Sequence, residues 1–89
     1  MNAVIIDDER LARLEIRQLL QKHPDVAVVA ECANGKEAVA AIAKEHPDVA
    51  FLDIQMPEMD GFGVLQSLNP QNLPYIIFVT AFDQYALRA

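Results

Sequence analysis

The chain has 89 residues, of which 53% are hydrophobic and 22% are charged, and its formal net charge is −6 at pH 7. This length predicts one small domain with a single core, and the composition excludes a disordered tail or a collagen-like fibre. The negative charge argues against a binder of nucleic acid or of a membrane surface, because anionic partners attract an excess of lysine and arginine.

The first predicted element is a strand over residues 2–6, a short β-branched run that stops at Asp7. This run lacks a basic start and reaches an aspartate too soon for a signal peptide, and the apolar runs are far shorter than the roughly 20 residues of a membrane span. A single cysteine, Cys32, cannot form an internal disulfide and is interpreted as a small apolar residue. These features predict a cytoplasmic protein.

A helical pattern begins at Glu9 and ends before Pro24, which cannot continue a helix. Leu11 and Leu14 lie off the apolar stripe of this helix, so the stripe is not clean. Four residues form the stripe: Ala12, Ile16, Leu19 and Leu20.

Strands and helices continue to alternate along the rest of the chain. Three further strands are predicted, over residues 26–33, 49–53 and 75–79. Two further helices are predicted, over residues 36–46 and 61–68, and a third begins at residues 82–89. The helix over 36–46 presents one apolar face: Ala38, Val39, Ile42 and Ala43.

The pentapeptide HPDVA occurs twice, at residues 23–27 and 46–50, each time between a helical pattern and a strand. A histidine near a helix C-terminus is favoured by the helix dipole, and the proline after it cannot continue the helix. His23 and His46 are therefore interpreted as helix-ending residues. A role in catalysis or metal binding is disfavoured because both residues precede a strand, whereas the functional end of such a strand is its carboxyl end.

This regular alternation predicts βαβ units, and hence a parallel sheet with helices on both faces. Right-handed crossovers and nearly continuous apolar strands are typical of such sheets. We therefore expect an α/β fold with a doubly wound parallel sheet, in one domain over residues 1–89.

Acidic and hydroxyl side chains follow three of the predicted strands. Asp7 and Asp8 follow the first strand, Asp53 ends the third, and Thr80 follows the fourth. In open parallel sheets the functional crevice lies outside the carboxyl ends of the strands. If the first and third strands are neighbours, their ends lie about 5 Å apart, and the three carboxylates share one pocket.

Three carboxylates in one pocket repel one another, so either some keep their protons with raised pKa values or a divalent cation lies among them. Mg2+ suits the second case, because it prefers oxygen ligands and leaves room for phosphate oxygens. An aspartate beside bound Mg2+ can accept a phosphoryl group, and the hydroxyl of Thr80 can donate to a phosphate oxygen.

Each of these residues also has a purely structural interpretation. Asp7 and Asp8 could cap the first helix, Asp53 could begin a turn, and Thr80 could cap the last helix. The combination of these positions in one sheet favours a functional site. Three other acidic residues are interpreted as solvated or capping residues: Glu9, Glu58 and Asp60.

The segments VIIDDE, FLDIQMPEMDGFGVL and FVTA, in this order and at these separations, resemble the receiver domain of two-component response regulators. The resemblance extends over essentially the whole chain and implies a flavodoxin-like sheet with the strand order 2-1-3-4. It implies that Asp53 is the phosphoryl acceptor. The implied Mg2+ ligands are Asp7, Asp8, Asp53 and the backbone carbonyl of Gln55.

By the same resemblance, Thr80 matches the switch hydroxyl, and Pro57 and Gly61 match the turn after the phosphorylation site. The implied partner is a sensor histidine kinase or a phosphotransfer protein. Three arginines of the first helix either form a docking face for that partner or are solvated charges near Glu9 and Glu15: Arg10, Arg13 and Arg17. The segment TAFDQYALRA is similar to receivers that precede a LytTR-type DNA-binding domain, which implies a transcriptional regulator whose effector domain is missing here.

The sequence departs from the family pattern at its end. The family's fifth strand and fifth helix, its switch aromatic and its strand-terminal lysine have no counterpart, and Tyr85 does not match the switch aromatic. We therefore expect a receiver domain truncated at its C-terminus, with an exposed fourth strand. A homodimer, or an exchange of elements between copies, is expected through strand 75–79 and segment 82–89.

Three functions follow from these expectations. The first is a signalling domain, not an enzyme acting on other substrates, in which phosphorylation of Asp53 changes a surface near Thr80. The second is a truncated fragment that no longer switches and serves as a dimerisation or interaction module. The third is a Mg2+-dependent phosphohydrolase, which is disfavoured because Gln55 replaces the second acid that such catalysis requires two residues after Asp53.

Overall fold

The computed structural model describes residues 1–54, 56 and 59–79 of the chain. Within them the elements are β1 (Asn2–Ile6), α1 (Arg10–Leu20), β2 (Ala27–Cys32), α2 (Gly35–Glu45), β3 (Val49–Asp53), α3 (Gly61–Ser67), the 3-10 turn η1 (Pro70–Asn72) and β4 (Tyr75–Val79). The predicted strands and helices agree with these elements to within a few residues. The predicted helix at 82–89 lies outside the described residues.

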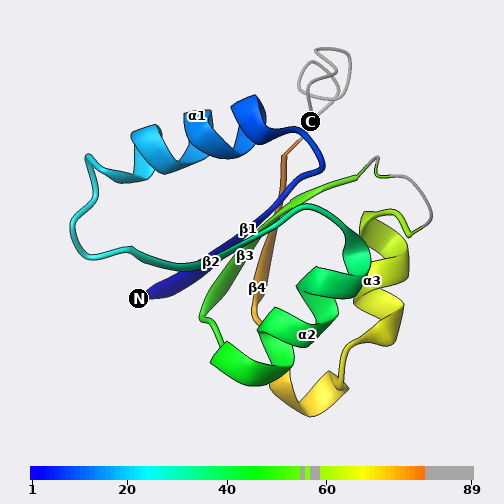
Figure 1. Ribbon diagram of the computed structural model, residues 1–89. Coiled ribbons are helices and arrows are strands. Elements are labelled where there is room, and N and C mark those ends of the chain that lie inside the picture. Colours follow the sequence, from blue (N-terminus) through cyan, green and yellow to red (C-terminus); the bar gives the residue numbers. More distant parts are fainter. Residues whose placement is uncertain (55, 57–58, 80–89) are drawn as a thin grey trace.

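The four strands form one parallel sheet in the order β2-β1-β3-β4. Helix α1 lies on one face of this sheet, and α2 and α3 lie on the other (Figure 1). The predicted α/β fold, with a doubly wound flavodoxin-like sheet of order 2-1-3-4, is thereby confirmed. Strands β1 and β3 are neighbours at the centre, and their register pairs Ile6 with Leu52.

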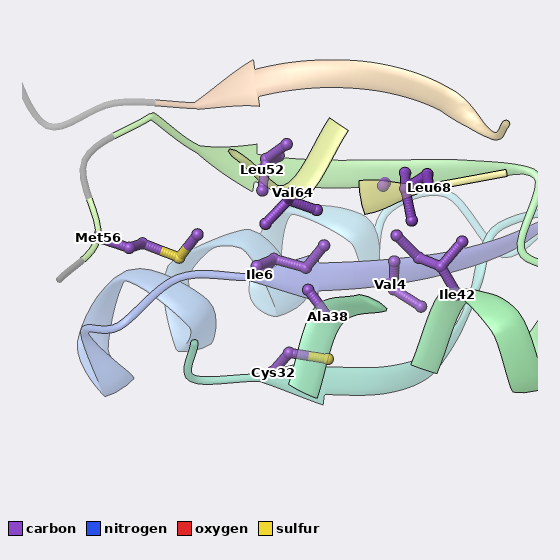
Figure 2. Close-up of a cluster of buried hydrophobic side chains, with 10 residues drawn as sticks. Val4, Ile6, Cys32, Ala38, Ile42, Leu52, Met56, Val64 and Leu68 are labelled. Carbon is purple, nitrogen blue, oxygen red and sulfur yellow. The ribbon is translucent and has the colours of Figure 1, made fainter. Parts of the chain in front are cut away.

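The main core lies between the sheet and helices α2 and α3 (Figure 2). Its members from the sheet are buried side chains of β1, β2 and β3: Val4, Ile6, Cys32, Ala50 and Leu52. Helices α2 and α3 contribute Ala38, Ile42 and Val64. The alternate residues of β1, Ala3 and Ile5, are also fully buried, so this strand is covered on both faces. The residues that follow β1 therefore extend from a firmly packed strand.

Helix α1 packs less completely than its sequence predicts. Ile16 is buried, as expected, but Leu19 is 61% exposed, so the predicted apolar stripe is wrong at that position. Leu11 and Leu14, which lie off the stripe, are exposed as well. Ala43 of the predicted face of α2 is exposed too, whereas Ala38 and Ile42 are buried. Among the described helices, none is both long and apolar enough to cross a lipid bilayer.

Helix α2 is closed at both ends by local interactions. At its start the backbone N–H of Glu37 donates to Asn34 Oδ1 at 2.8 Å, which is a standard N-cap. At its end His46 has a left-handed backbone with φ 47°, and its N–H donates to the carbonyl of Ile42. His23 lies in the turn after α1, where its N–H donates to the carbonyl of Leu20. These positions agree with the interpretation of both histidines as helix-ending residues.

Strand β4 is the edge of the described sheet, with β3 as its neighbour. Tyr75 is 83% exposed, and Ile77 and Phe78 are more than 40% exposed. In the described part of the chain, the fourth strand is thus an exposed edge, as the sequence predicts. The ring of Phe78 contacts that of Phe62 on α3, with 5.5 Å between centroids.

Candidate functional site

Three carboxylates meet at the carboxyl ends of the two central strands. Asp7 follows β1 directly, and Asp53 is the last residue of β3, one position beyond the paired Ile6 and Leu52. Asp7, Asp8 and Asp53 each offer a carboxylate oxygen, and these oxygens lie within 4.8 Å of one another. The structure thus brings together the three residues that the sequence predicts to share one pocket, which we call the acidic cluster.

The acidic cluster fits a hard divalent cation. Mg2+ binds oxygens at about 2.1 Å, so two oxygens on one ion lie about 3 to 4 Å apart. The carboxylate oxygens of the acidic cluster lie within 4.8 Å of one another, which is close to that range. The cluster contains no sulfur or imidazole ligand, and a set made of oxygens favours Mg2+ over zinc or copper. The donor set is therefore suited to the cation that the resemblance implies.

Asp7 is the most enclosed member of the acidic cluster, with 5% of its surface exposed. Burial raises its pKa from 3.8 to about 6; the backbone N–H of Glu9 opposes this rise, and the charges of Asp53 and Asp8 add to it. That N–H donates to Asp7 Oδ1 at 2.9 Å, and the N–H of Asp7 donates to the carbonyl of Cys32 at 3.0 Å. Asp7 therefore makes a local turn with Glu9 and also faces the other carboxylates. Its structural interpretation as the cap of the first helix is not borne out, because the N-cap of α1 is Glu9, which has no side-chain cap hydrogen bond.

Helix α3 begins directly against the end of β3. The N–H of Gly61 donates to the carbonyl of Ile54 at 2.9 Å. A Cβ at Gly61 would lie 2.8 Å from the backbone oxygen of Asp53 and 3.2 Å from Ile54 Cα, so a larger residue would displace the strand end. Asp60 caps α3 by accepting from the N–H of Gly63 at 2.9 Å, in agreement with its interpretation as a capping residue. Gly61 therefore permits the close approach that fixes the backbone of Asp53.

Three residues with predicted roles at the site lie outside the described part of the chain: Gln55, Pro57 and Thr80. Glu58, which is interpreted as a solvated or capping residue, lies outside it too. Tyr85 and segment 82–89 lie outside it as well. Val79, which precedes Thr80 in the sequence, pairs with Asp53 in the sheet. The roles assigned to these residues from the sequence stay predictions.

The structure also places Arg13 at the site, a role that the sequence did not predict. Its Nη1 donates to the carbonyl oxygen of Asp7 at 2.7 Å, and its Nε lies 3.5 Å from Glu31 Oε1. Arg17 Nε donates to Glu31 Oε2 at 2.6 Å. Arg13 is therefore largely enclosed, whereas Arg17 is the exposed charge that the sequence allowed. The acidic partner of both is Glu31, where the sequence suggested Glu9 and Glu15. The sequence does contain one indication of this contact. Glu31 is a charged residue within the otherwise apolar run of β2, and such a residue indicates a basic partner nearby.

In sequence, the chain is similar to response regulators. The family model described as the response regulator receiver domain matches residues 3–89. The transcriptional regulatory protein BtsR of Salmonella typhi is 51% identical over all 89 residues. An uncharacterised response regulatory protein of Yersinia pestis is 47% identical over the same length. The chain spans 37% of the length of each of these relatives.

Solved structures have the same fold. The signal receiver domain of the response regulator NarL from Mycobacterium tuberculosis has a TM-score of 0.82 and 34% identity; the match covers 97% of this chain and 70% of that one. The CheX-CheY-BeF3-Mg+2 complex from Borrelia burgdorferi has a TM-score of 0.82 and 26% identity, and the match covers 98% of this chain and 66% of that one. The Borrelia complex includes both BeF3 and Mg2+.

Proposed function

The chain belongs to the family of response regulator receiver domains, and from that premise we propose that it is a phosphorylation-controlled signalling domain whose acceptor is Asp53. The acidic cluster at the ends of β1 and β3 is the observation that carries this proposal. The proposed donor is a phosphohistidine of a sensor histidine kinase. The domain would modify its own aspartate and would not act as an enzyme on other substrates.

In the proposed reaction a carboxylate oxygen of Asp53 attacks the phosphorus of the phosphohistidine. A P–O bond forms and the P–N bond breaks, and the electron pair of that bond stays on the imidazole, which takes up a proton. Asp7, Asp8 and Asp53, with the backbone carbonyl of Gln55, would hold Mg2+, which when bound neutralises charge on the transferred oxygens. The hydroxyl of Thr80 would then donate to a phosphoryl oxygen and act as the switch.

We propose that the output of the whole protein lies in a part of it outside this chain. The relatives named above include transcriptional regulatory proteins, and the chain spans 37% of their length. We propose that the longer protein controls transcription in the cytoplasm through a C-terminal DNA-binding region, since the net charge of −6 suits this domain poorly for binding nucleic acid. The LytTR-type assignment of that region stays a prediction.

Phosphoryl transfer can be tested with a small-molecule donor. Incubation with acetyl phosphate and Mg2+ is expected to add one phosphoryl group to the intact chain, and borohydride trapping followed by peptide mass analysis should locate it at Asp53. Chelation of Mg2+ should suppress the uptake, because no cation then neutralises the transferred oxygens. A folded protein that binds Mg2+ but gains no phosphoryl group would contradict the proposal and favour the interaction module. Sustained release of inorganic phosphate would favour the phosphohydrolase.

We also propose that the described edge strand β4 associates with a second copy of the chain, together with segment 82–89. The proposal rests on the exposed apolar side chains of β4, which include Tyr75 and Ile77. Sedimentation velocity of the 89-residue chain at high concentration is expected to show dimers that Ile77→Lys dissociates. Leu19→Lys, which alters an exposed leucine on α1, is the matched control and should leave the dimer intact. A well-folded wild-type monomer at that concentration would refute this mode of association.

A further inference from the structure

We propose that Arg13 is a positioning residue for the acidic cluster: it holds the peptide that joins Asp7 to Asp8 and thereby strengthens the binding of a divalent cation. This inference rests on the proposed function of the same site. The contact that carries it is the 2.7 Å hydrogen bond from Arg13 Nη1 to the carbonyl oxygen of Asp7. This oxygen belongs to the peptide between the two aspartates, so the bond acts on both of them.

The backbone at Asp7 is the point where the chain leaves the sheet. The N–H of Asp7 still pairs with the carbonyl of Cys32 on β2 at 3.0 Å, although β1 itself ends at Ile6. The carbonyl of Asp7 receives the guanidinium of Arg13 instead, and a hydrogen bond from a charged donor is stronger than one between neutral groups. Asp8 is exposed, so packing does little to orient it. The direction of its side chain therefore depends on the peptide plane that Arg13 holds.

Arg13 is itself held by Glu31 of β2. Its Nε lies 3.5 Å from Glu31 Oε1, while the other carboxylate oxygen accepts from Arg17 at 2.6 Å. The side chain of Arg13 is 17% exposed and that of Arg17 is 43% exposed. A guanidinium has several donors in a rigid plane, so Arg13 can serve the carbonyl of Asp7 and the carboxylate of Glu31 at once. Arg17 shares the partner Glu31 and is the natural comparison.

Positioning and charge predict opposite effects for the loss of Arg13. A positive charge beside a cation site repels the cation, so its removal alone would tighten Mg2+ binding. Loss of the bond to Asp7 would instead free the peptide and weaken binding. Changes to groups that orient metal ligands typically weaken metal affinity by about 10- to 100-fold. We expect a loss of about tenfold for Arg13→Gln, at the lower end of that range, because Asp53 keeps its place on β3.

The test measures the Mg2+ affinity of Arg13→Gln and of Arg17→Gln by isothermal titration calorimetry. Both changes remove one positive charge and one contact with Glu31, but only the first removes the bond to Asp7. Arg13→Gln is expected to weaken Mg2+ binding about tenfold. Arg17→Gln is expected to leave it unchanged or slightly tighter. In the metal-free proteins, the backbone amide resonances of Asp8 and Glu9 should shift in the Arg13 variant and stay in place in the Arg17 variant.

Arg13→Lys provides a second test, in case Arg13→Gln fails to fold. Lysine keeps the charge but cannot span Asp7 and Glu31 together, so Mg2+ binding several-fold weaker than in the wild type is expected. Wild-type affinity or tighter binding in a folded Arg13 variant would overturn the inference while leaving the proposed function intact. A wild-type protein that binds no Mg2+ would overturn both.

Discussion

An Asp53→Asn variant is expected to take up no phosphoryl group from acetyl phosphate, because an amide lacks the carboxylate nucleophile. The same change removes one of three negative charges that lie within 4.8 Å of one another. Relief of this repulsion is worth about 1 kcal/mol even in a water-like dielectric, so the metal-free variant should melt about 4 to 8 °C higher than the wild type. Intact mass measures the first effect, and thermal melting in chelator measures the second.

Asp25→Asn is the matched control for Asp53→Asn. It makes the same change of charge and shape in the turn before β2, where the contact of Asp25 with Met1 is made by its backbone oxygen. This variant should keep phosphoryl uptake and should not gain stability. Uptake by Asp53→Asn would show that another residue is the acceptor. A loss of stability as large as the roughly 2 to 5 kcal/mol of a core leucine-to-alanine change would show that Asp53 is structural.

The affinity for Mg2+ is expected to fall about tenfold between pH 7 and pH 5, because a proton on Asp7 competes with the cation. The raised pKa of about 6 means that Asp7 is about 90% ionised at pH 7 and about 10% ionised at pH 5. Calorimetric titrations at the two pH values measure the effect. Asp7→Asn should bind Mg2+ weakly, with little change between these pH values.

The same pKa predicts how the stability of the metal-free domain depends on pH. The folded state binds the proton of Asp7 more tightly than the unfolded state, because the pKa rises from 3.8 to about 6 on folding. Asp7 therefore contributes stability below about pH 4 that is lost as pH rises through 6, with a limit of about 3 kcal/mol. Asp7→Asn avoids this loss, so its melting temperature in chelator should rise relative to the wild type between pH 4 and pH 7. A difference in melting temperature between Asp7→Asn and the wild type that stays the same from pH 4 to pH 7 would contradict the raised pKa of Asp7.

Much of the fold and of the acidic cluster could be predicted because both depend on local patterns and on a general rule of parallel sheets. Apolar runs that alternate with helical periodicity predict the elements, and the carboxyl ends of adjacent parallel strands lie at one edge. Asp7 and Asp53 are far apart in the sequence, yet this rule brings them together once β1 and β3 are neighbours, an order that the family resemblance implies. The close approach of Gly61 to the backbone of Asp53 adds a detail that only coordinates supply.

What could not be predicted depends on which surfaces meet in three dimensions. Leu19 belongs to a helical stripe by spacing, but α1 leaves it exposed. Ala43 belongs by spacing to the apolar face of α2, but it is exposed as well. The contacts of Arg13 with Asp7 and Glu31 join three separate segments, and helical spacing shows only that Arg13 and Arg17 share a face.

The buried position of Cys32 makes the reactivity of its thiol a measure of how often the structure around β2 opens. Cys32 is 2% exposed, and burial raises the pKa of its thiol to about 11, so very little reactive thiolate is present at neutral pH. Its backbone carbonyl accepts from the N–H of Asp7. A thiol-directed reagent can therefore modify this residue only when the chain opens around β2. The rate of this labelling would therefore also measure the opening that breaks the hydrogen bond between the N–H of Asp7 and the carbonyl of Cys32.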